Sequence, residues 1–493
     1  MLDEMRHNNI NILSIIIFVS LQIFVILNIT NDRVLYEKFL LNQYSNIPSY
    51  SENELNDIPK PEHPHIGKFQ DRFMTLDPEL GYVPFERLQE SFIETQDIYN
   101  DSHGMSRDIT WSNVPSNMGG RTRTLMYDPI VPNKVWAGGV SGGLWFNNNI
   151  LDDNSIWEPV NDFWSNISVS KIIYDPNNPE IFYVSTGEAN TAIITYRESS
   201  SKGIGIWKSV DAGNSWTLIE STQGFEYITD IEIKNSNGNS EIYAGVVSGT
   251  YQGENHESSP SDGLYRSIDG GLSWIQTLPT IDNINENYSP ADIEINSNGR
   301  IFVGTMKNIN GNGGSTILYS DNGGINTWTV NDNFKHLIED DQDYNIPGRI
   351  VLSSCKIAPE IIYAVVGSGF INSMDFNLSY GNYIIKSIDE GINWDSVNLP
   401  TDNGNEWASL AWHALSVTVH PENPESIFIG GLELYRSLNG GNSWNDLSDW
   451  SLMYYGGGDR YVHADIHQIV FNPNNINESI VATDGGLFLS SNI

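Results

Sequence analysis

The stretch Ser209-Val210-Asp211-Ala212-Gly213-Asn214-Ser215-Trp216 carries the pattern Ser-x-Asp-x-Gly-x-x-Trp, which returns further along the chain. Its Asp can bond backbone N–H groups two residues on, its Gly permits a positive φ, and its Trp can begin the next strand. The pattern therefore predicts a hairpin turn between two antiparallel strands, with a structural role for its residues. The residues that define the copies are Ser209, Asp211, Gly213, Trp216, Ser267, Asp269, Gly271, Trp274, Ser387, Asp389, Gly391, Trp394, Ser437, Asn439, Gly441 and Trp444.

The spacing of these turns indicates a repeat. The Trp residues that close them, including a degenerate first copy and a looser fourth one, stand at positions 157, 216, 274, 328, 394 and 444. Units of this length with several short strands are typical of a β-propeller built from four-stranded antiparallel blades. We expect an all-β fold with about seven blades over residues 109–493.

The two ends of the repeat region leave two alternatives for the last blade. The chain stops at Leu489-Ser490-Ser491-Asn492-Ile493, which resembles the start of another turn. Either the last blade is truncated, or a strand at 109–114, which contains Trp111, pairs with strands from 462–489 and closes the ring without an exposed sheet edge.

The N-terminal region differs in composition from the repeats. Residues 10–29 form an uncharged apolar run long enough to cross a bilayer as a helix, which predicts export, with 1–31 as a signal peptide or a membrane anchor. Residues 32–108 lack the repeat and contain several prolines, so we expect a linker and a small extension. Contact with a membrane is expected only through the N-terminal segment.

Charge and cysteine content exclude some classes of function. The chain has 25 Lys and Arg against 62 Asp and Glu, a net charge of −37. This balance argues against binding nucleic acid or anionic lipid through bulk charge. Cys355 is the single cysteine, so no intramolecular disulfide is possible, which disfavours a disulfide-stabilised ectodomain and suits an exported bacterial protein. We expect a monomer.

Together with the turns, three further motifs resemble the Asp-box (BNR-repeat) propeller superfamily. They are Gly138-Gly139-Val140-Ser141-Gly142-Gly143-Leu144-Trp145, Thr186-Gly187-Glu188-Ala189-Asn190, and Val462-His463-Ala464-Asp465-Ile466-His467 with Thr483-Asp484-Gly485-Gly486. That superfamily includes sialidases, oligoxyloglucan hydrolases and sortilin-type receptors, and the chain looks most like secreted bacterial sortilin-like or glycosyl-hydrolase-like proteins. The resemblance implies a propeller, and one fold here serves enzymes and binding proteins alike.

Departures from the enzymes of this superfamily favour a binding role. The repeats contain few arginines where a sialidase needs a triad, and Val140-Ser141 stand where the oligoxyloglucan hydrolases have an Asp. A sortilin-type cysteine-rich module is also missing from the sequence. The leading hypothesis is therefore an extracytoplasmic binding or scaffold module for a glycan or protein ligand. The alternative is a glycoside hydrolase that uses a carboxylate pair at the propeller channel.

One segment carries the candidate chemistry. Tyr461, His463, Asp465 and His467 are spaced by two, so an extended strand would place them on one face, toward the channel if the strand is innermost. These four residues could bind a ligand, and His463, Asp465 and His467 could hold a divalent metal ion. Asp465 could also act as an acid or base with Asp484 and Glu188. The remaining alternative is that these side chains bond one another and only fix the blade centre.

Overall fold

The computed structural model describes residues 77, 79–80, 84, 87, 94, 120–161, 164, 166–189, 201–251, 254–371, 377–400 and 406–493. The predictions for 1–31, for nearly all of 32–108 and for a strand at 109–114 lie outside these residues. Within the part that the structure describes, no helix is long and apolar enough to span a membrane.

The described chain forms seven antiparallel sheets that act as propeller blades, six with four strands and the last with three. Blade 1 contains β1 (Thr122–Tyr127), β2 (Val135–Gly139), β3 (Gly143–Asn147) and β4 (Trp157–Pro159), and blade 2 contains β5 (Val169–Asp175), β6 (Asn178–Thr186), β7 (Ile206–Ser209) and β8 (Thr217–Leu218). Blade 3 contains β9 (Tyr227–Ser236), β10 (Asn239–Val247), β13 (Gly263–Ser267) and β14 (Ile275–Gln276), and blade 4 contains β15 (Ser289–Ile295), β16 (Ile301–Met306), β17 (Ile317–Ser320) and β18 (Thr329–Asn331). Blade 5 contains β19 (Ile346–Cys355), β20 (Ala358–Ile371), β21 (Asn377–Ser387) and β22 (Asp395–Val397), and blade 6 contains β23 (Ser416–His420), β24 (Asn423–Gly430), β25 (Leu434–Ser437) and β26 (Asn445–Asp446). Blade 7 contains β27 (Ile466–Asn472), β28 (Asn475–Thr483) and β29 (Gly486–Ser490).

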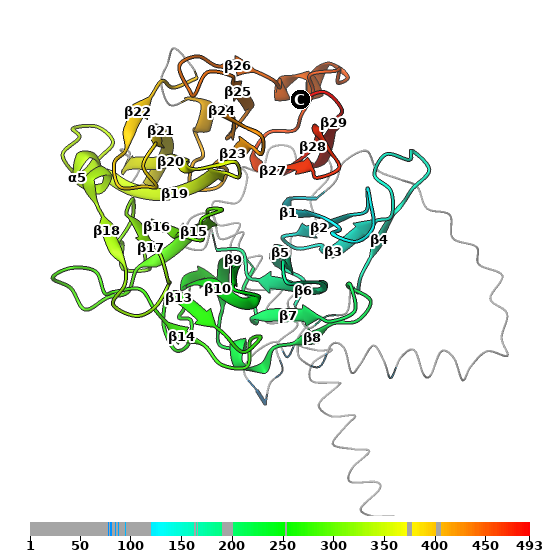
Figure 1. The fold of residues 1–493 in the computed structure, drawn as a ribbon, viewed down its shortest axis with the longest axis horizontal. Helices are drawn as coiled ribbons and strands as arrows, with labels where there is room; N and C mark the ends of the chain where they lie inside the picture. Colours follow the sequence, from blue (N-terminus) through cyan, green and yellow to red (C-terminus); the bar gives the residue numbers. More distant parts are fainter. Residues whose placement is uncertain are drawn as a thin grey trace, which may run out of the picture. The chain divides into compact units, whose positions relative to one another are not determined.

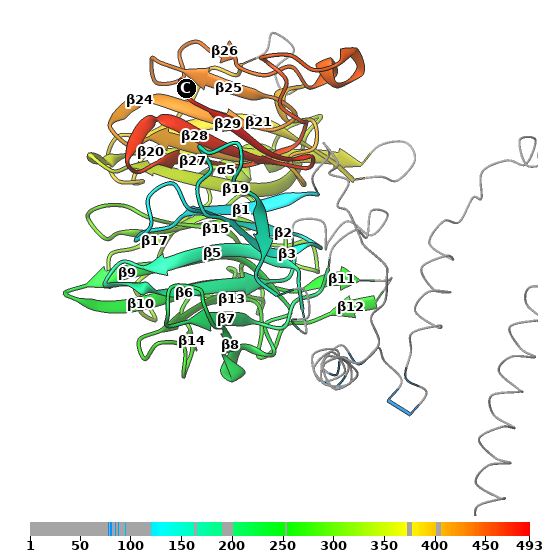
Figure 2. The ribbon, with the colours of Figure 1, turned by 90° about the vertical axis from the view of Figure 1, so that its right-hand side faces the viewer.

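Short elements join the blades. A two-stranded ribbon, β11 (Gly249–Tyr251) and β12 (Glu254–His256), extends from blade 3 (Figure 2). Within the described part of the repeat region, four short helices lie in the connections. These helices are η3 (Glu220–Thr222), α5 (Asn333–Glu339), η4 (Glu406–Ala408) and η5 (Trp450–Tyr455).

The blades follow one another in chain order around a ring, and the first strand of each blade faces the centre (Figure 1). Strands β1 and β27 contact each other, so blade 7 packs against blade 1. A buried cluster across this junction combines Leu125 and Val135 of blade 1 with Ile480 and Ala482 of blade 7. The all-β propeller predicted from the repeat is confirmed. The seven innermost strands, β1, β5, β9, β15, β19, β23 and β27, surround a central channel.

We use the name rim turns for residues 209–216, 267–274, 387–394 and 437–444, which join the third and fourth strands of blades 2, 3, 5 and 6. Each rim turn connects an antiparallel pair, as predicted. In the first turn the Ser209 hydroxyl donates to Asp211 at 2.8 Å and accepts from the Gly213 N–H, also at 2.8 Å. The reach predicted for the Asp side chain is wrong, because Asp211 Oδ1 accepts from the N–H of Ser215, four residues on. Gly213 has φ +83°, a left-handed conformation that glycine adopts without a steric penalty.

The hydrophobic core lies between adjacent blades. Trp136 of β2 is 1% exposed and packs with Phe182 of β6 and with Trp216, which closes the rim turn of blade 2. The same arrangement recurs between the other blades, because apolar strand residues on both faces of each sheet meet a neighbouring sheet. This packing fixes the innermost strands and therefore the positions of the side chains at the channel.

Candidate functional site

Polar side chains in the channel connect neighbouring blades. The innermost strand of a blade has one edge without a partner strand, and its backbone N–H groups need acceptors. Side chains of the adjacent blade supply them at separations of 2.6 to 3.2 Å. The acceptor and donor pairs are Thr124 with Ile172, Asp230 with Ile293, Asp292 with Leu352, Ser353 with Val419, and Gln468 with Leu125. Many channel residues therefore have a structural role.

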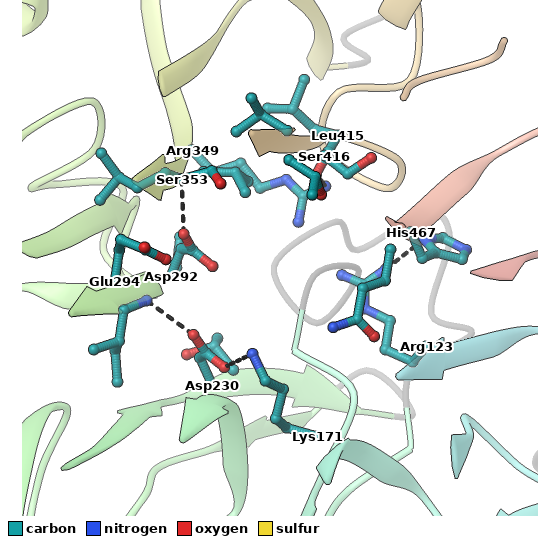
Figure 3. Close-up of a pocket in the computed structure, with 18 of the residues that line it drawn as sticks. Arg123, Lys171, Asp230, Asp292, Glu294, Arg349, Ser353, Leu415, Ser416 and His467 are labelled. Atoms are coloured by element: carbon teal, nitrogen blue, oxygen red, sulfur yellow. Dashed lines mark hydrogen bonds and ion pairs between the residues drawn. The ribbon is translucent and has the colours of Figure 1, made fainter. Parts of the chain in front are cut away.

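Between these strands lies a cavity of about 280 Å³, lined by residues of all seven innermost strands (Figure 3). On one side Lys171 forms ion pairs with Asp230 at 2.7 Å and Glu232 at 3.2 Å. Burial raises the pKa of Glu232 and of Asp292 to about 7 and that of Glu294 to about 8, although the Lys171 ammonium opposes the shift of the first two. The cavity is thus polar, and part of its acidic charge is neutral at physiological pH.

We define the channel mouth as the end of the channel where the innermost strands begin. The second strand of each blade runs antiparallel to the first, so loops that follow second strands reach the same end. Glu188 follows β6, Asp484 follows β28, and His413 and Asp465 precede β23 and β27. Side chains from blades 1, 2, 6 and 7 thereby converge. The residues of the channel mouth are Arg121, Arg123, Glu188, His413, Asp465, His467 and Asp484.

Asp484 is held between two imidazoles. Its Oδ1 lies 2.7 Å from Nε2 of His467, and its Oδ2 lies 3.0 Å from Nε2 of His413. The two imidazole rings meet edge to face, with centroids 5.1 Å apart. Although burial raises the pKa of Asp484, the hydrogen bonds from His413 and His467 outweigh it and hold the pKa well below its usual value. Asp484 is therefore ionised at any physiological pH.

The protonation state of His467 follows from its partners. Nη1 of Arg123 lies 2.7 Å from His467 Nδ1, and a guanidinium can only donate, so Nδ1 accepts. The single proton of the neutral ring is then on Nε2, where it is donated to Asp484. Burial, assisted by the Arg123 charge, lowers the pKa of His467 to about 3. His467 is thus neutral, in one fixed tautomer.

This tautomer does not fit a metal ion at the cluster. His413, His467 and Asp484 each offer a ligand atom, and these atoms lie within 4.8 Å of one another. A metal needs a bare imidazole nitrogen. In His467, however, Nε2 carries the proton and Nδ1 accepts from Arg123. A metal could bind there only if Arg123 moved away, so we derive no chemistry from a metal at this site.

Two further carboxylates of the channel mouth have different surroundings. Glu188 is 1% exposed and lies 3.7 Å from Arg121. Asp465 has φ +65°, a strained conformation for a residue with a side chain, and among the described residues its buried Oδ1 has no hydrogen-bond partner. Burial raises the pKa of Asp465, which His413 opposes and Asp484 reinforces. Asp465 and Asp484 are electrostatically coupled, and their pKa values move in opposite directions.

The single-strand arrangement predicted for Tyr461, His463, Asp465 and His467 is wrong. Strand β27 begins only at Ile466, because Asp465 takes the left-handed conformation and turns the chain. His463 lies against its own backbone, with Nδ1 3.0 Å from the Ala464 carbonyl oxygen, and Tyr461 packs on Phe488. His467 and Asp484 do meet, and Asp465 lies within electrostatic reach of Asp484.

The residues that surround His467 and Asp484 were not predicted from the sequence. His413 stands in no recognisable motif, and only the fold brings it to Asp484. Arg121 and Arg123 did carry a signal, since they alternate with Thr122 directly at the start of the first innermost strand. That period of two could have placed Arg123 toward the channel.

The fold and the channel mouth define the class of the protein as a seven-bladed β-propeller with a polar central cavity. No family model matches the chain, and no curated protein matches it in sequence. Among solved structures it is similar to a GH74 enzyme described as ancestral (TM-score 0.54, 18% identity, covering 78% of this chain and 46% of that one). It is also similar to the GH74 xyloglucanase from Xanthomonas campestris (TM-score 0.50, 15% identity, covering 78% and 53%). A weaker similarity is to YCF48 from Cyanidioschyzon merolae (TM-score 0.46, 17% identity, covering 77% and 98%).

These similarities concern the fold. The chain spans about half the length of the two GH74 enzymes, covering 46% and 53% of them. At such low identity they show a shared propeller and leave the activity open.

Proposed function

We propose that this chain is a binding module of the Asp-box propeller type that acts outside the cytoplasm and captures a glycan or protein ligand at the channel mouth. The location rests on the apolar run at 10–29, and the propeller type rests on the repeated turns. The site rests on the channel mouth described above.

The observation that carries this proposal is the fixed hydrogen-bond chain from Arg123 through His467 and Asp484 to His413. It joins blades 1, 7 and 6, so the folded propeller holds these groups in place before a ligand arrives. Prearranged polar groups at a cavity lower the cost of binding, because little side-chain freedom is lost. Neither His467 nor Asp484 is set up to donate a proton to a substrate, since Asp484 stays ionised and the proton of neutral His467 is held by Asp484.

The test compares two Asp→Asn variants of the full chain on an array of soluble glycans and peptides. Asp484→Asn alters the charge at the channel mouth, whereas Asp269→Asn makes the same change at a rim turn. Removing one partner of a buried charged pair costs about 2–5 kcal/mol of binding, so we expect Asp484→Asn to weaken a bound ligand by about tenfold or more. Asp269→Asn should leave binding unchanged. Ligand binding that survives Asp484→Asn in a folded protein, or an array without any bound ligand, would contradict the proposal.

The second candidate is a glycoside hydrolase, and one observation favours it. The pKa of Asp465 is raised while that of Asp484 is lowered, which is the division of roles between a proton donor and an ionised carboxylate.

The hydrolase candidate has its own experiment. The full chain and its Asp465→Asn variant are incubated with plant, algal and sialylated glycans, and released sugar is measured by chromatography. Release that is lost in Asp465→Asn and kept in Asp269→Asn would establish catalysis at the channel mouth. If the folded wild-type protein releases no sugar, the hydrolase candidate is excluded for those glycans and the binding module remains.

A further inference from the structure

Arg349 carries a buried positive charge, and none of the described carboxylates contacts it. The residue, at the start of β19, is 6% exposed. Its Nε donates to the carbonyl oxygen of Ala411 at 2.8 Å, and its Nη2 donates to those of His413 at 3.2 Å and Leu415 at 3.3 Å. Among the described residues no carboxylate forms an ion pair with it. Carbonyl oxygens satisfy its N–H groups, and the carboxylates of Glu188 and Asp292 support its charge electrostatically without forming an ion pair with it.

Arg123 lies beside Arg349 in the same cavity. Its Nη1 donates to the His413 carbonyl oxygen at 3.3 Å, so the two guanidiniums share one acceptor. Arg123 also donates to the His467 ring, which is neutral. Burial, followed by the charge of Arg123, lowers the pKa of Arg349 to about 9. The charge of Arg123 thus disfavours that of Arg349, while the carboxylate of Glu188 supports both.

We propose that Arg123 and Arg349 bind the carboxylate of an acidic monosaccharide, a hexuronate, inside the channel cavity; this assignment rests on the proposed binding function and names its ligand class. A planar carboxylate matches the paired N–H donors of a guanidinium, and its charge would supply the counter-ion in contact that both arginines lack among the described residues. In Arg349 the donor left for such a ligand is Nη1, because Nε and Nη2 donate to carbonyl oxygens.

The rest of the cavity suits a sugar ring. In Figure 3 Arg349 lies beside Ser353 and Asp292, and Arg123 lies on the other side of the cavity near His467. Burial keeps the carboxyl groups of Asp292 and Glu294 partly protonated, and Asp230 is paired with Lys171, so these groups can exchange hydrogen bonds with sugar hydroxyls and the cavity suits a hydroxyl-rich monoanion. Further hydroxyl groups come from Ser170, Thr229, Ser353, Ser416 and Thr418. A volume of about 280 Å³ is at the small end for ligand pockets and holds a single ring.

A purely structural role for Arg349 is the alternative, because it holds three carbonyls of residues 411–415 in place. The experiment therefore uses two arginines and two kinds of readout. Calorimetric titration of the full chain compares glucuronate and galacturonate with glucose and with glucuronamide, which keeps the shape of the sugar and loses its charge. Succinate and inorganic phosphate serve as anions without a sugar ring.

We expect one of the uronates to bind at least tenfold more tightly than glucose, glucuronamide, succinate and phosphate. Arg349→Lys keeps the positive charge but loses the planar guanidinium with its several N–H donors, and Arg123→Gln removes the charge. Each variant should weaken uronate binding at least tenfold. Arg460→Gln, an exposed arginine paired with Asp446, is the matched control and should bind as the wild type does. Thermal unfolding of each variant reports its folding, and if Arg349→Lys does not fold, Arg123→Gln decides.

The outcomes separate this inference from the proposed function. If neither uronate binds while another ligand of the array binds and is lost in Asp484→Asn, the hexuronate assignment is wrong and the binding module stands. If succinate or phosphate binds as tightly as the uronates, the cavity recognises anions in general and the sugar assignment is wrong. Uronate binding that Arg123→Gln and Arg349→Lys leave unchanged would place it elsewhere and overturn the inference.

Discussion

The rim turns and the channel mouth are both polar, but they obtain their hydrogen bonds differently. In the first rim turn, Ser209 bonds Asp211, and Asp211 bonds Ser215, so partners are two to four residues apart. At the channel mouth, Asp484 and His467 are 17 residues apart, and His467 and Arg123 are 344 apart. The rim turns are local and repeated, whereas the channel mouth forms only when the ring closes. Repetition indicates a structural role, and the side chains that differ from blade to blade are those available for a specific ligand.

The largest expected effect comes from breaking a contact between blades in the channel. Asp230 is 3% exposed, pairs with Lys171 at 2.7 Å and accepts from the N–H of Ile293 in the next blade. Asp230→Ala takes one ion-pair partner from the Lys171 ammonium and leaves the N–H of Ile293 without its acceptor. We expect a loss of about 3–5 kcal/mol in the free energy of unfolding, measured by urea denaturation. A loss below about 1 kcal/mol would show that bonds between blades add little stability.

A smaller effect is expected at a rim turn. Ser267 is 1% exposed, and its hydroxyl accepts from the Gly271 N–H at 2.9 Å and donates to Asp269 at 2.8 Å. Ser267→Ala removes both bonds within one hairpin, and we expect a loss of about 1–2 kcal/mol in the same denaturation experiment. If this loss exceeds that of Asp230→Ala, the distinction between local turns and contacts between blades fails.

A third effect is a dependence of stability on pH. Burial raises the pKa of Glu294 from 4.5 to about 8, so between these values the folded protein binds more protons than the unfolded chain. The stabilising contribution of this group is complete below pH 4.5 and is lost as pH rises through about 8. Glu232 and Asp292, with pKa values of about 7, act in the same direction.

The variant that tests this pH effect is Glu294→Gln, which keeps an oxygen for the N–H of Ser354 and cannot ionise. Urea denaturation at pH 5 and at pH 9 should show a smaller loss of stability toward pH 9 in Glu294→Gln than in the wild type. Equal losses in both proteins would mean that Glu294 titrates normally.

The fold could be predicted from the sequence because its determinants are local. The spacing of Trp157, Trp216, Trp274 and the later copies gave the blade length, and the antiparallel hairpins at the rim turns are confirmed. The candidate site could be predicted only in part. His467 and Asp484 were predicted as site residues. The extended strand predicted for Asp465 does not form, because its positive φ turns the chain, and alternation of residue types does not reveal that angle.

The rest of the site depends on ring closure. His413 and Arg123 reach Asp484 and His467 from other blades, and no spacing within the chain encodes those contacts. Arg349 lies near the start of its strand without any local pattern that separates it from a surface residue. Sequence periodicity predicts which way a side chain points, whereas contacts across a ring need the positions of all blades.

The central claim is that a fixed hydrogen-bond chain across three blades prearranges the channel mouth, and the protonation of His467 tests it most directly. The measurement is NMR of the full chain with ¹⁵N-labelled histidine, following the ring nitrogens of His467 from pH 4 to pH 8. The account predicts a neutral ring with its proton on Nε2 throughout this range, because its pKa is lowered to about 3. A ring that takes up a second proton near its usual pKa of 6.5, or that carries its proton on Nδ1, would contradict the account.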